Sequence, residues 1–155
     1  MPQGAGGCRQ SAGRAPAGCV SREQVDLLVK RFLSLARYVW AGPNTCLGIA
    51  LGWLLGGRFQ VVQGVVEIHG QRVAWVLNRF WVPAMAITLG HCVLGQTQAG
   101  LDATRAHERV HVRQYERWGS FFIPAYLVAW AVLSCQGRDG YRENPFEVQA
   151  YREGG

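Results

Sequence analysis

The chain has 155 residues and a formal net charge of +6, from 16 basic and 10 acidic residues. This length predicts one domain with a modest hydrophobic core. The basic residues form no long run interleaved with aromatic side chains, so we expect no nucleic-acid binding, while a weak attraction to an anionic membrane surface stays open. The five cysteines include no CxxC pair, which predicts neither a disulfide framework nor a cysteine metal site. Cys46, Cys92 and Cys135 lie in apolar surroundings and are expected to be buried thiols.

The first 20 residues are rich in glycine, alanine and arginine and lack hydrophobic periodicity, so 1–20 is predicted to be a disordered leader. No apolar segment directly follows its basic residues, which indicates no cleavable signal peptide and favours a cytoplasmic or peripherally membrane-associated protein. Residues 21–155 are predicted to form a single domain. Its N-terminal part, 22–57, is predicted to hold two apolar helices that are separated by a break at Gly42-Pro43. Glycines 48 and 52 are spaced for close helix packing.

The middle of the chain predicts a small antiparallel sheet. Residues 59–69 are expected to form a strand with a break at Gly64, and 72–80 its partner. Residues 85–95 are expected to form a further strand or a bent hairpin. His69 and His91 have no metal-ligand spacing to any other residue, so we expect them to be structural or surface histidines.

The most informative stretch is residues 101–118, which contain the motif HExxH from His107 to His111. Side chains four residues apart share one face of a helix, so both imidazoles can reach one metal ion. Glu108 lies about 100° round the helix from His107, beside the metal, where a general base is needed. The helix is predicted to end at Gly119. The alternative is a chance match, with two core histidines and a surface glutamate.

A third ligand is expected further along the chain, because catalytic zinc usually takes three protein ligands and keeps a fourth position open. Asn144 and Pro145 predict the start of a short C-terminal helix, as its N-cap and first residue. Glu147 then lies in the first turn, and Tyr151 lies one turn further on the same face. Two roles stay open for Glu147, which is placed either as a metal ligand or as the glutamate of a capping box.

These motifs resemble those of zinc metallopeptidases. HExxH followed by a glutamate on a later helix, in an ExxA context, resembles the gluzincin type. HERVHVRQYERWG with YRENPFEVQAY more closely resembles a family of small, largely uncharacterised bacterial proteins regarded as metallopeptidases. The resemblance implies that His107, His111 and Glu147 bind Zn2+ and that Glu108 is the general base.

The closer resemblance covers residues 38–152, and the element pattern with it predicts an α+β fold with a minimal zincin-like core. That fold would contain N-terminal helices, the small antiparallel sheet, the HExxH helix, an apolar helix and a short glutamate helix. Peptidases of this type hold an extended substrate along an edge strand that precedes the HExxH helix. Larger gluzincins have an acidic residue where this chain has Tyr151, whose hydroxyl we regard as a candidate oxyanion stabiliser.

Two apolar segments, 44–57 and 121–135, raise the question of a membrane span. Each is shorter than the roughly 20 residues that a bilayer crossing needs. If 121–135 crossed fully, His107 and Glu147 would lie on opposite sides of the membrane and could not share a metal ion. We therefore expect 121–135 to be a buried hairpin helix, entered near Pro124, for which a position against the membrane surface stays open. The N-terminal helices are candidates for a lipid anchor.

The sequence thus predicts a zinc-dependent metallopeptidase that hydrolyses peptide or protein substrates through a zinc-activated water. The competing hypothesis is a non-catalytic, membrane-associated metal-binding or scaffold protein. The presence of Glu108 favours the enzyme, because a structural metal site needs no general base. The sequence predicts no particular substrate, cleavage preference or oligomeric state.

Overall fold

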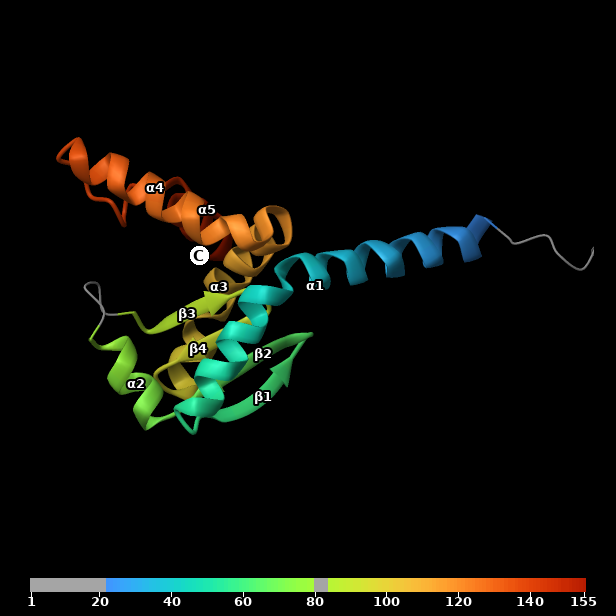
Figure 1. Ribbon diagram of the computed structural model, residues 1–155, viewed down its shortest axis with the longest axis horizontal. Helices are drawn as coiled ribbons and strands as arrows, with labels where there is room; N and C mark the ends of the chain where they lie inside the picture. The colour runs from blue at the N-terminus through green and yellow to red at the C-terminus, as the bar shows by residue number, and fades with distance from the viewer. Residues whose placement is uncertain (1–21, 80–83) are drawn as a thin grey trace, which may run out of the picture.

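A four-stranded sheet lies at the centre of the computed structural model, which describes residues 22–79 and 84–155 (Figure 1). The predicted leader, 1–20, lies outside the described residues. The described chain is α+β, as predicted. Its elements, in chain order, are α1 (Arg22–Leu54), β1 (Arg58–Val62), β2 (Val65–His69), α2 (Gln71–Leu77), β3 (Ala86–Leu89), β4 (Cys92–Gly95), α3 (Gln98–Trp118), the 3-10 turn η1 (Gly119–Phe121), α4 (Phe122–Cys135) and α5 (Pro145–Gly154).

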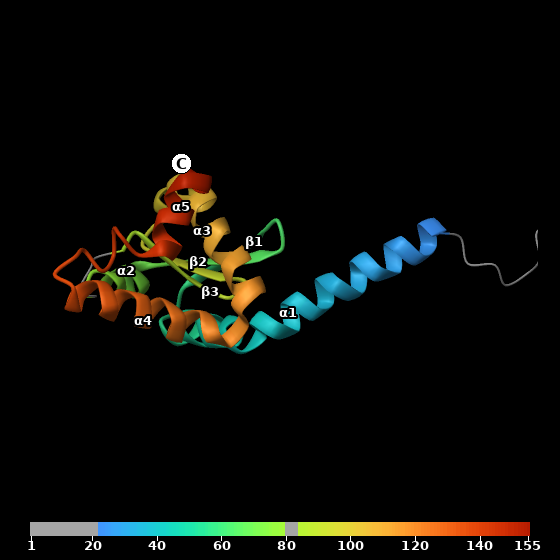
Figure 2. The same ribbon diagram turned by 90° about the horizontal axis from the view of Figure 1, so that it is seen from above.

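Helices cover both faces of the sheet. Figure 2 shows the C-terminal half of α1 and α4 along one side of the molecule, the sheet behind them, and α3 and α5 on the far side. The N-terminal half of α1 projects away from this body (Figure 1). Apolar side chains fill the space between the layers. The buried clusters are Ile68, Val73, Leu77, Leu89, Cys92 and Leu94 between the sheet, α1 and α2; Val65, Ala86, Val93, Leu101 and Val112 between the sheet and α3; and Ala41, Tyr115 and Phe122 where α1, α3 and α4 meet.

The predicted break at Gly64 is a tight hairpin turn between β1 and β2. These strands pair antiparallel from Arg58 opposite His69 to Val62 opposite Val65, so Gln63 and Gly64 alone make the turn. Both have positive φ, 49° and 79°. A two-residue hairpin turn of this kind follows the natural twist of the strands, and glycine adopts it without strain.

The sheet is mixed, and the prediction of an antiparallel sheet with 72–80 as a strand was wrong. The strand order is β1-β2-β4-β3, with β2 and β4 parallel and β3 and β4 antiparallel. Residues 71–77 form helix α2, whose Val73 and Leu77 are buried one turn apart. The helix carries the chain across to β3, and the bent hairpin predicted for 85–95 then returns β4 beside β2. This arrangement leaves β3 at the edge of the sheet.

Helix α1 is continuous, and the predicted break at Gly42-Pro43 was wrong. Proline removes only one backbone hydrogen bond and favours a kink, and α1 changes direction near its middle in Figure 1. Tertiary contacts hold both sides of this point, because Ala41 is fully buried and Asn44 donates to the carbonyl of Gly119 at 3.3 Å.

Close packing of the glycines in the second half of α1 is confirmed. A Cβ atom at Gly52 would lie 2.4 Å from Cδ1 of Ile68, and one at Gly48 would lie 2.9 Å from Cβ of Cys92. These glycines therefore let α1 lie directly on β2 and β4. The prediction of three buried thiols holds for Cys92 only, because Cys46 and Cys135 are exposed.

Helix α4 is the predicted apolar helix, but the prediction that it is buried was wrong. Only Phe122 and Leu133 of α4 are buried, whereas Leu127, Val128 and Val132 are exposed, because only one side of the helix packs against the rest of the molecule. The run α3-η1-α4, Gln98–Cys135, contains a window that is long and apolar enough to cross a membrane, by length and composition only. The apolar part is α4 itself, which has 14 residues. At 1.5 Å per residue it is about 21 Å long, shorter than the roughly 30 Å hydrocarbon core of a bilayer.

Candidate metal centre

Helix α3 presents the HExxH motif and is fixed at both ends. Thr97 caps its start by accepting a hydrogen bond from the Gly100 amide at 3.0 Å. Gly119 ends it at φ 57°, as predicted, and its missing side chain leaves room for the ring of Trp40. Caps of this kind satisfy backbone groups that a helix terminus would otherwise leave without partners.

Two arginines of α3 bind the helix to the sheet. Arg105 donates two hydrogen bonds to the carboxylate of Glu67 on β2, at 2.8 and 2.9 Å, and Arg109 donates to the Val62 carbonyl on β1. Glu67 is buried, and its hydrogen bond with Arg105 lowers the pKa of its carboxyl group. A bidentate charged pair of this kind fixes the rotation of the helix and so the direction of its histidines.

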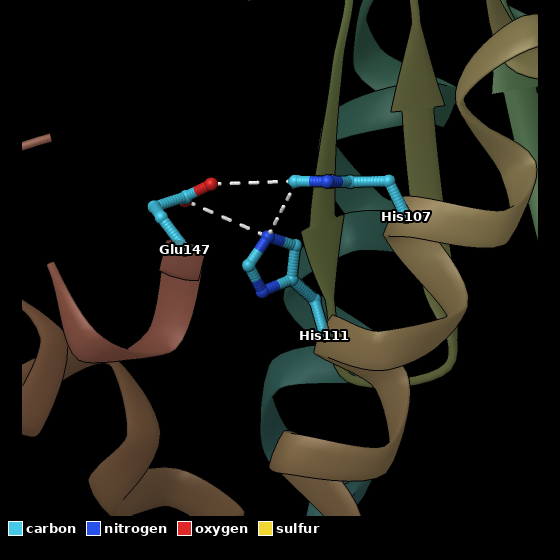
Figure 3. Close-up of side chains that lie close together, drawn as sticks. All are labelled: His107, His111 and Glu147. Carbon is cyan, nitrogen blue, oxygen red and sulfur yellow. Dashed lines mark hydrogen bonds and ion pairs between the residues drawn. The ribbon is translucent and has the colours of Figure 1, made fainter. Parts of the chain in front are cut away.

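Helix α5 presents Glu147 toward those histidines. Asn144 accepts from the Phe146 amide at 3.2 Å and Pro145 follows it, so the predicted N-cap is confirmed. A capping box would need the backbone amide of Asn144 to donate to the Glu147 carboxylate. It is not formed, because this backbone amide donates to the Tyr141 carbonyl. The Glu147 carboxylate is therefore directed at α3 (Figure 3).

The two imidazoles and this carboxylate converge on one point (Figure 3). Nε2 of His107 lies 3.2 Å from Nε2 of His111 and 3.3 Å from Oε2 of Glu147. Nε2 of His111 lies 3.5 Å from Oε1 of Glu147. Among the described residues this is the one group of three or more such side chains close enough to hold a metal ion.

These three distances fit the demands of a tetrahedral ion. With ligand bonds of about 2.0–2.1 Å, neighbouring ligand atoms of such an ion lie about 3.3 Å apart. Oε2 of Glu147 is also buried and makes no hydrogen bond. Leaving such an atom without a partner is costly, so the arrangement fits a cation that lies between the three side chains.

The electrostatics of the site suit a cation as well. Burial raises the pKa of the Glu147 carboxyl group, but its contacts with His107 and His111 outweigh burial and lower the pKa to about 2. Burial lowers the pKa of His111, but Glu147 and the charge of Glu108 outweigh it, so that this pKa is raised. Two buried carboxylates beside two imidazoles thus favour positive charge at this point.

Neighbouring side chains orient two of the three candidate ligands. Oε1 of Gln114 accepts from Nδ1 of His111 at 2.8 Å, so that in the neutral imidazole Nε2 is the nitrogen without a proton, and it is directed at the site. The Tyr126 hydroxyl on α4 donates to Oε1 of Glu147 at 2.9 Å. Neither role was predicted from the sequence, although Gln114 follows His111 by three residues and so shares its helix face.

Glu108 lies beside the three side chains and is buried, at 6% exposure. Oγ1 of Thr88 on β3 donates to Oε2 of Glu108 at 2.6 Å. Burial raises the pKa of the Glu108 carboxyl group, and the hydrogen bond with Thr88 opposes this rise. The chance-match alternative placed Glu108 on the surface, whereas the structure holds it in one fixed orientation inside the molecule.

A cavity of about 470 Å3 opens at this point between α3, α4 and β3. All four polar groups just described, His107, His111, Glu147 and Glu108, line its wall. The remaining wall is mostly apolar or aromatic. These other lining residues are Ala84, Ala86, Ile87, Thr88, Leu89, Tyr115, Phe122, Ile123, Tyr126, Leu127, Trp130 and Tyr141.

Tyr151, the predicted oxyanion stabiliser, lies behind the site. Its ring packs edge-on against His107, with ring centroids 4.6 Å apart, and is half exposed. Tyr151 is not among the residues that line the cavity, whereas Tyr141 is, and the two hydroxyl oxygens lie 3.4 Å apart. Tyr151 therefore contacts the His107 ring by packing alone. An acidic residue at this position would instead accept a hydrogen bond from the imidazole.

The remaining histidines lie away from the site, as predicted. His91 lies in the turn that joins β3 to β4 and is buried. Its ring stacks on Tyr38, and its Nε2 lies 3.2 Å from the Glu116 carboxylate. His69 ends β2. Comparison of the chain with known proteins found no matching protein-family model, curated protein or solved structure.

Proposed function

We propose that this protein is a zinc-dependent peptidase. One observation carries the proposal: three donor atoms at tetrahedral spacing line a cavity together with a buried glutamate that has no place among them as a ligand. A site that only held a metal would not need Glu108 beside it. The gluzincin resemblance of the two motifs supports the same conclusion.

In this proposal His107, His111 and Glu147 hold the ion. Zinc, if bound there, would supply a Lewis acid for the scissile carbonyl and would lower the pKa of its water to about 7. Glu108 accepts a proton from the attacking water at Oε1 and then delivers it to the leaving amine, while Thr88 holds Oε2.

Strand β3 is suited to bind the substrate backbone. It pairs with β4 on one side only, and all its residues, Ala86–Leu89, line the cavity. An extended peptide can pair with the open side through backbone hydrogen bonds, which tolerate many sequences. The apolar wall would then favour a substrate with large apolar side chains next to the cleaved bond.

The test is Glu108→Gln in zinc-loaded protein. The amide has nearly the shape of the carboxylate and no ligand role, so the variant should bind one zinc per chain as the wild type does. It cannot accept the proton, so cleavage should fall by a factor on the order of a hundred or more. Sequencing the cuts in an unbiased peptide mixture measures this and identifies the substrate.

Two results would overturn the proposal. The first is zinc binding that is unchanged in Glu147→Ala, which would remove the third ligand. The second is full zinc loading with no cleavage above the Glu108→Gln background, on free or on membrane-bound peptides. That second result would favour a non-catalytic metal-binding or scaffold protein.

A further inference from the structure

Exposed apolar side chains cover one side of the molecule. They come from two helices, α4 and the C-terminal half of α1, which lie along the same side in Figure 2. Trp40 and Phe121, whose ring centroids are 6.3 Å apart, join the two helices. We call this surface the α1/α4 layer. Its exposed members are Trp40, Leu47, Ile49, Leu51, Trp53, Leu54, Phe121, Leu127, Val128 and Val132.

The charge pattern of the sequence follows the same two helices. Residues 38–57 and 118–137 contain no charged side chain. Arginines bound both runs, namely Arg37 and Arg58 for the first and Arg117 and Arg138 for the second. Soluble helices normally carry polar residues on their outer face, whereas a helix that is apolar on all sides is covered by protein or by lipid. Basic residues at the ends of an apolar run suit anionic lipid headgroups.

We propose that the α1/α4 layer lies on an anionic lipid bilayer, and that the cavity beside it takes apolar peptide segments held at that bilayer surface. The net charge of +6 attracts the molecule to such a surface. Helix α4 lies in the plane of the membrane, because it is too short to cross it and the chain on either side of it meets at the candidate metal centre. The C-terminal half of α1 lies in the same plane, because Gly48 and Gly52 pack it against β4 and β2 of the sheet.

The second half of the proposal follows from the position of α4. One side of this helix lines the cavity through Phe122, Ile123, Tyr126, Leu127 and Trp130. Leu127 is also exposed and belongs to the α1/α4 layer. The rim of the cavity therefore lies at the proposed membrane surface, where an apolar segment can enter without passing through water. This half rests on the proposed peptidase function, and the first half does not.

The surface is tested by flotation of the full chain with vesicles of phosphatidylcholine and phosphatidylserine in equal parts. Wild type should float with the vesicles, and more weakly with phosphatidylcholine alone. Leu54→Glu combined with Val128→Glu places one charge on each helix of the layer, at residues that are 69% and 63% exposed. This variant should bind the mixed vesicles at least about tenfold more weakly, since each change replaces apolar burial with a buried charge.

The matched control is Val148→Glu, which makes the same substitution at a 49% exposed valine on α5, on the far side of the molecule (Figure 2). It should float as wild type does. Circular dichroism checks that each variant is folded, and the pair Leu54→Gln and Val128→Gln gives a milder version of the same test. The surface proposal fails if wild type does not float, or if the control and the double variant lose binding equally. It also fails if the double variant instead splits a dimer, because a second copy would then cover the layer.

Supply of substrate from the membrane is tested with one cleavable peptide, either free or attached to a lipid anchor in the same vesicles. Wild type should cut the anchored form faster. The double variant should lose this preference and keep the rate on the free peptide. Equal rates on both forms would overturn the supply step and leave the surface in place. Flotation without any cleavage would overturn the peptidase function alone.

Discussion

Gln114→Leu gives a direct test of how the candidate metal ligand His111 is oriented for the proposed zinc. Gln114 is buried, and Oε1 of its amide accepts from Nδ1 of His111 at 2.8 Å. Its amide nitrogen donates to the Phe146 carbonyl at 3.0 Å and to Oε1 of Gln149 at 3.1 Å. These bonds fix the amide, which in turn fixes both the tautomer and the rotation of the imidazole. Leucine has a similar size and can make none of these bonds.

The expected loss of zinc affinity is 10-fold to 100-fold, the usual effect of removing a group that orients a metal ligand. This corresponds to about 1.4–2.7 kcal/mol. The structure supports this range because Gln114 and His111 are both buried, so water has little access to take the place of the Gln114 side-chain amide. In the variant, Nδ1 of His111 therefore has no hydrogen-bond partner. Competition for zinc against a colorimetric chelator measures the dissociation constant, and thermal unfolding of the metal-free protein measures any general loss of stability.

Gln149→Leu is the matched control. It removes one acceptor from the Gln114 amide and leaves the bond between Gln114 and His111, so zinc affinity should change by about threefold or less. The reasoning is refuted if folded Gln114→Leu binds zinc within threefold of wild type. It is also refuted if Gln149→Leu weakens binding as strongly, because the effect would then come from the position of α5.

Three further predictions concern packing, pH and the proposed base. Gly52→Ala would place a methyl group 2.4 Å from the side chain of Ile68, so the free energy of unfolding, measured in urea, should fall by about 1–3 kcal/mol. Gly42→Ala in the same helix has no atom within 4 Å of the new methyl group and should leave the free energy of unfolding unchanged. The hydrogen bond with Arg105 lowers the pKa of Glu67 from its usual value of 4.5. The ionised carboxylate therefore stabilises the fold above pH 4.5, and this stabilisation is lost as the pH falls through the lowered pKa. The difference in Tm between wild type and Glu67→Gln should shrink on acidification. If the peptidase proposal holds, Thr88→Val removes the hydrogen bond that orients Glu108, so kcat should fall about tenfold to a hundredfold while KM stays unchanged. Thr88→Ser keeps the hydroxyl and should restore kcat. An equal loss in both variants would count against this positioning role.

The sequence predicted those features that depend on neighbouring residues. The N-cap at Asn144 and the helix end at Gly119 follow from backbone geometry and local hydrogen bonds, and both are confirmed. The interruption at Gly64 was predicted as a break within one strand, whereas it is the turn between two strands that pair with each other. The convergence of His107 and His111 follows from helix periodicity in the same way. Local chemistry therefore specified most of the candidate ligand set before any fold was known.

The errors lie where distant contacts decide the outcome. Residues 73–77 form an unbroken apolar run, which by itself suits either a buried strand or a helix. Burial of Val73 and Leu77 one turn apart beneath the sheet favours a helix, and the parallel pairing of β2 and β4 follows from that helix. Pro43 would end an isolated helix, but contacts on both sides hold α1 together. Thr88 could not be linked to Glu108 from sequence, because β3 meets α3 only through the fold.

Helix α4 connects the two proposals physically. A helix that is apolar on all sides has no preferred rotation in water, because turning it exposes one apolar side in place of another. Yet the Tyr126 hydroxyl must face Glu147 for their hydrogen bond to form, and this requires one rotation. Contacts of Phe122 with Tyr115 and Phe146 fix the start of α4, while Leu127, Val128 and Val132 remain exposed further along. Val128 lies two residues from Tyr126, about 200° round the helix, so the proposed lipid surface and the candidate ligand contact different sides of α4. A charge at Val128 can therefore weaken binding to lipid while the hydrogen bond between Tyr126 and Glu147 stays in place.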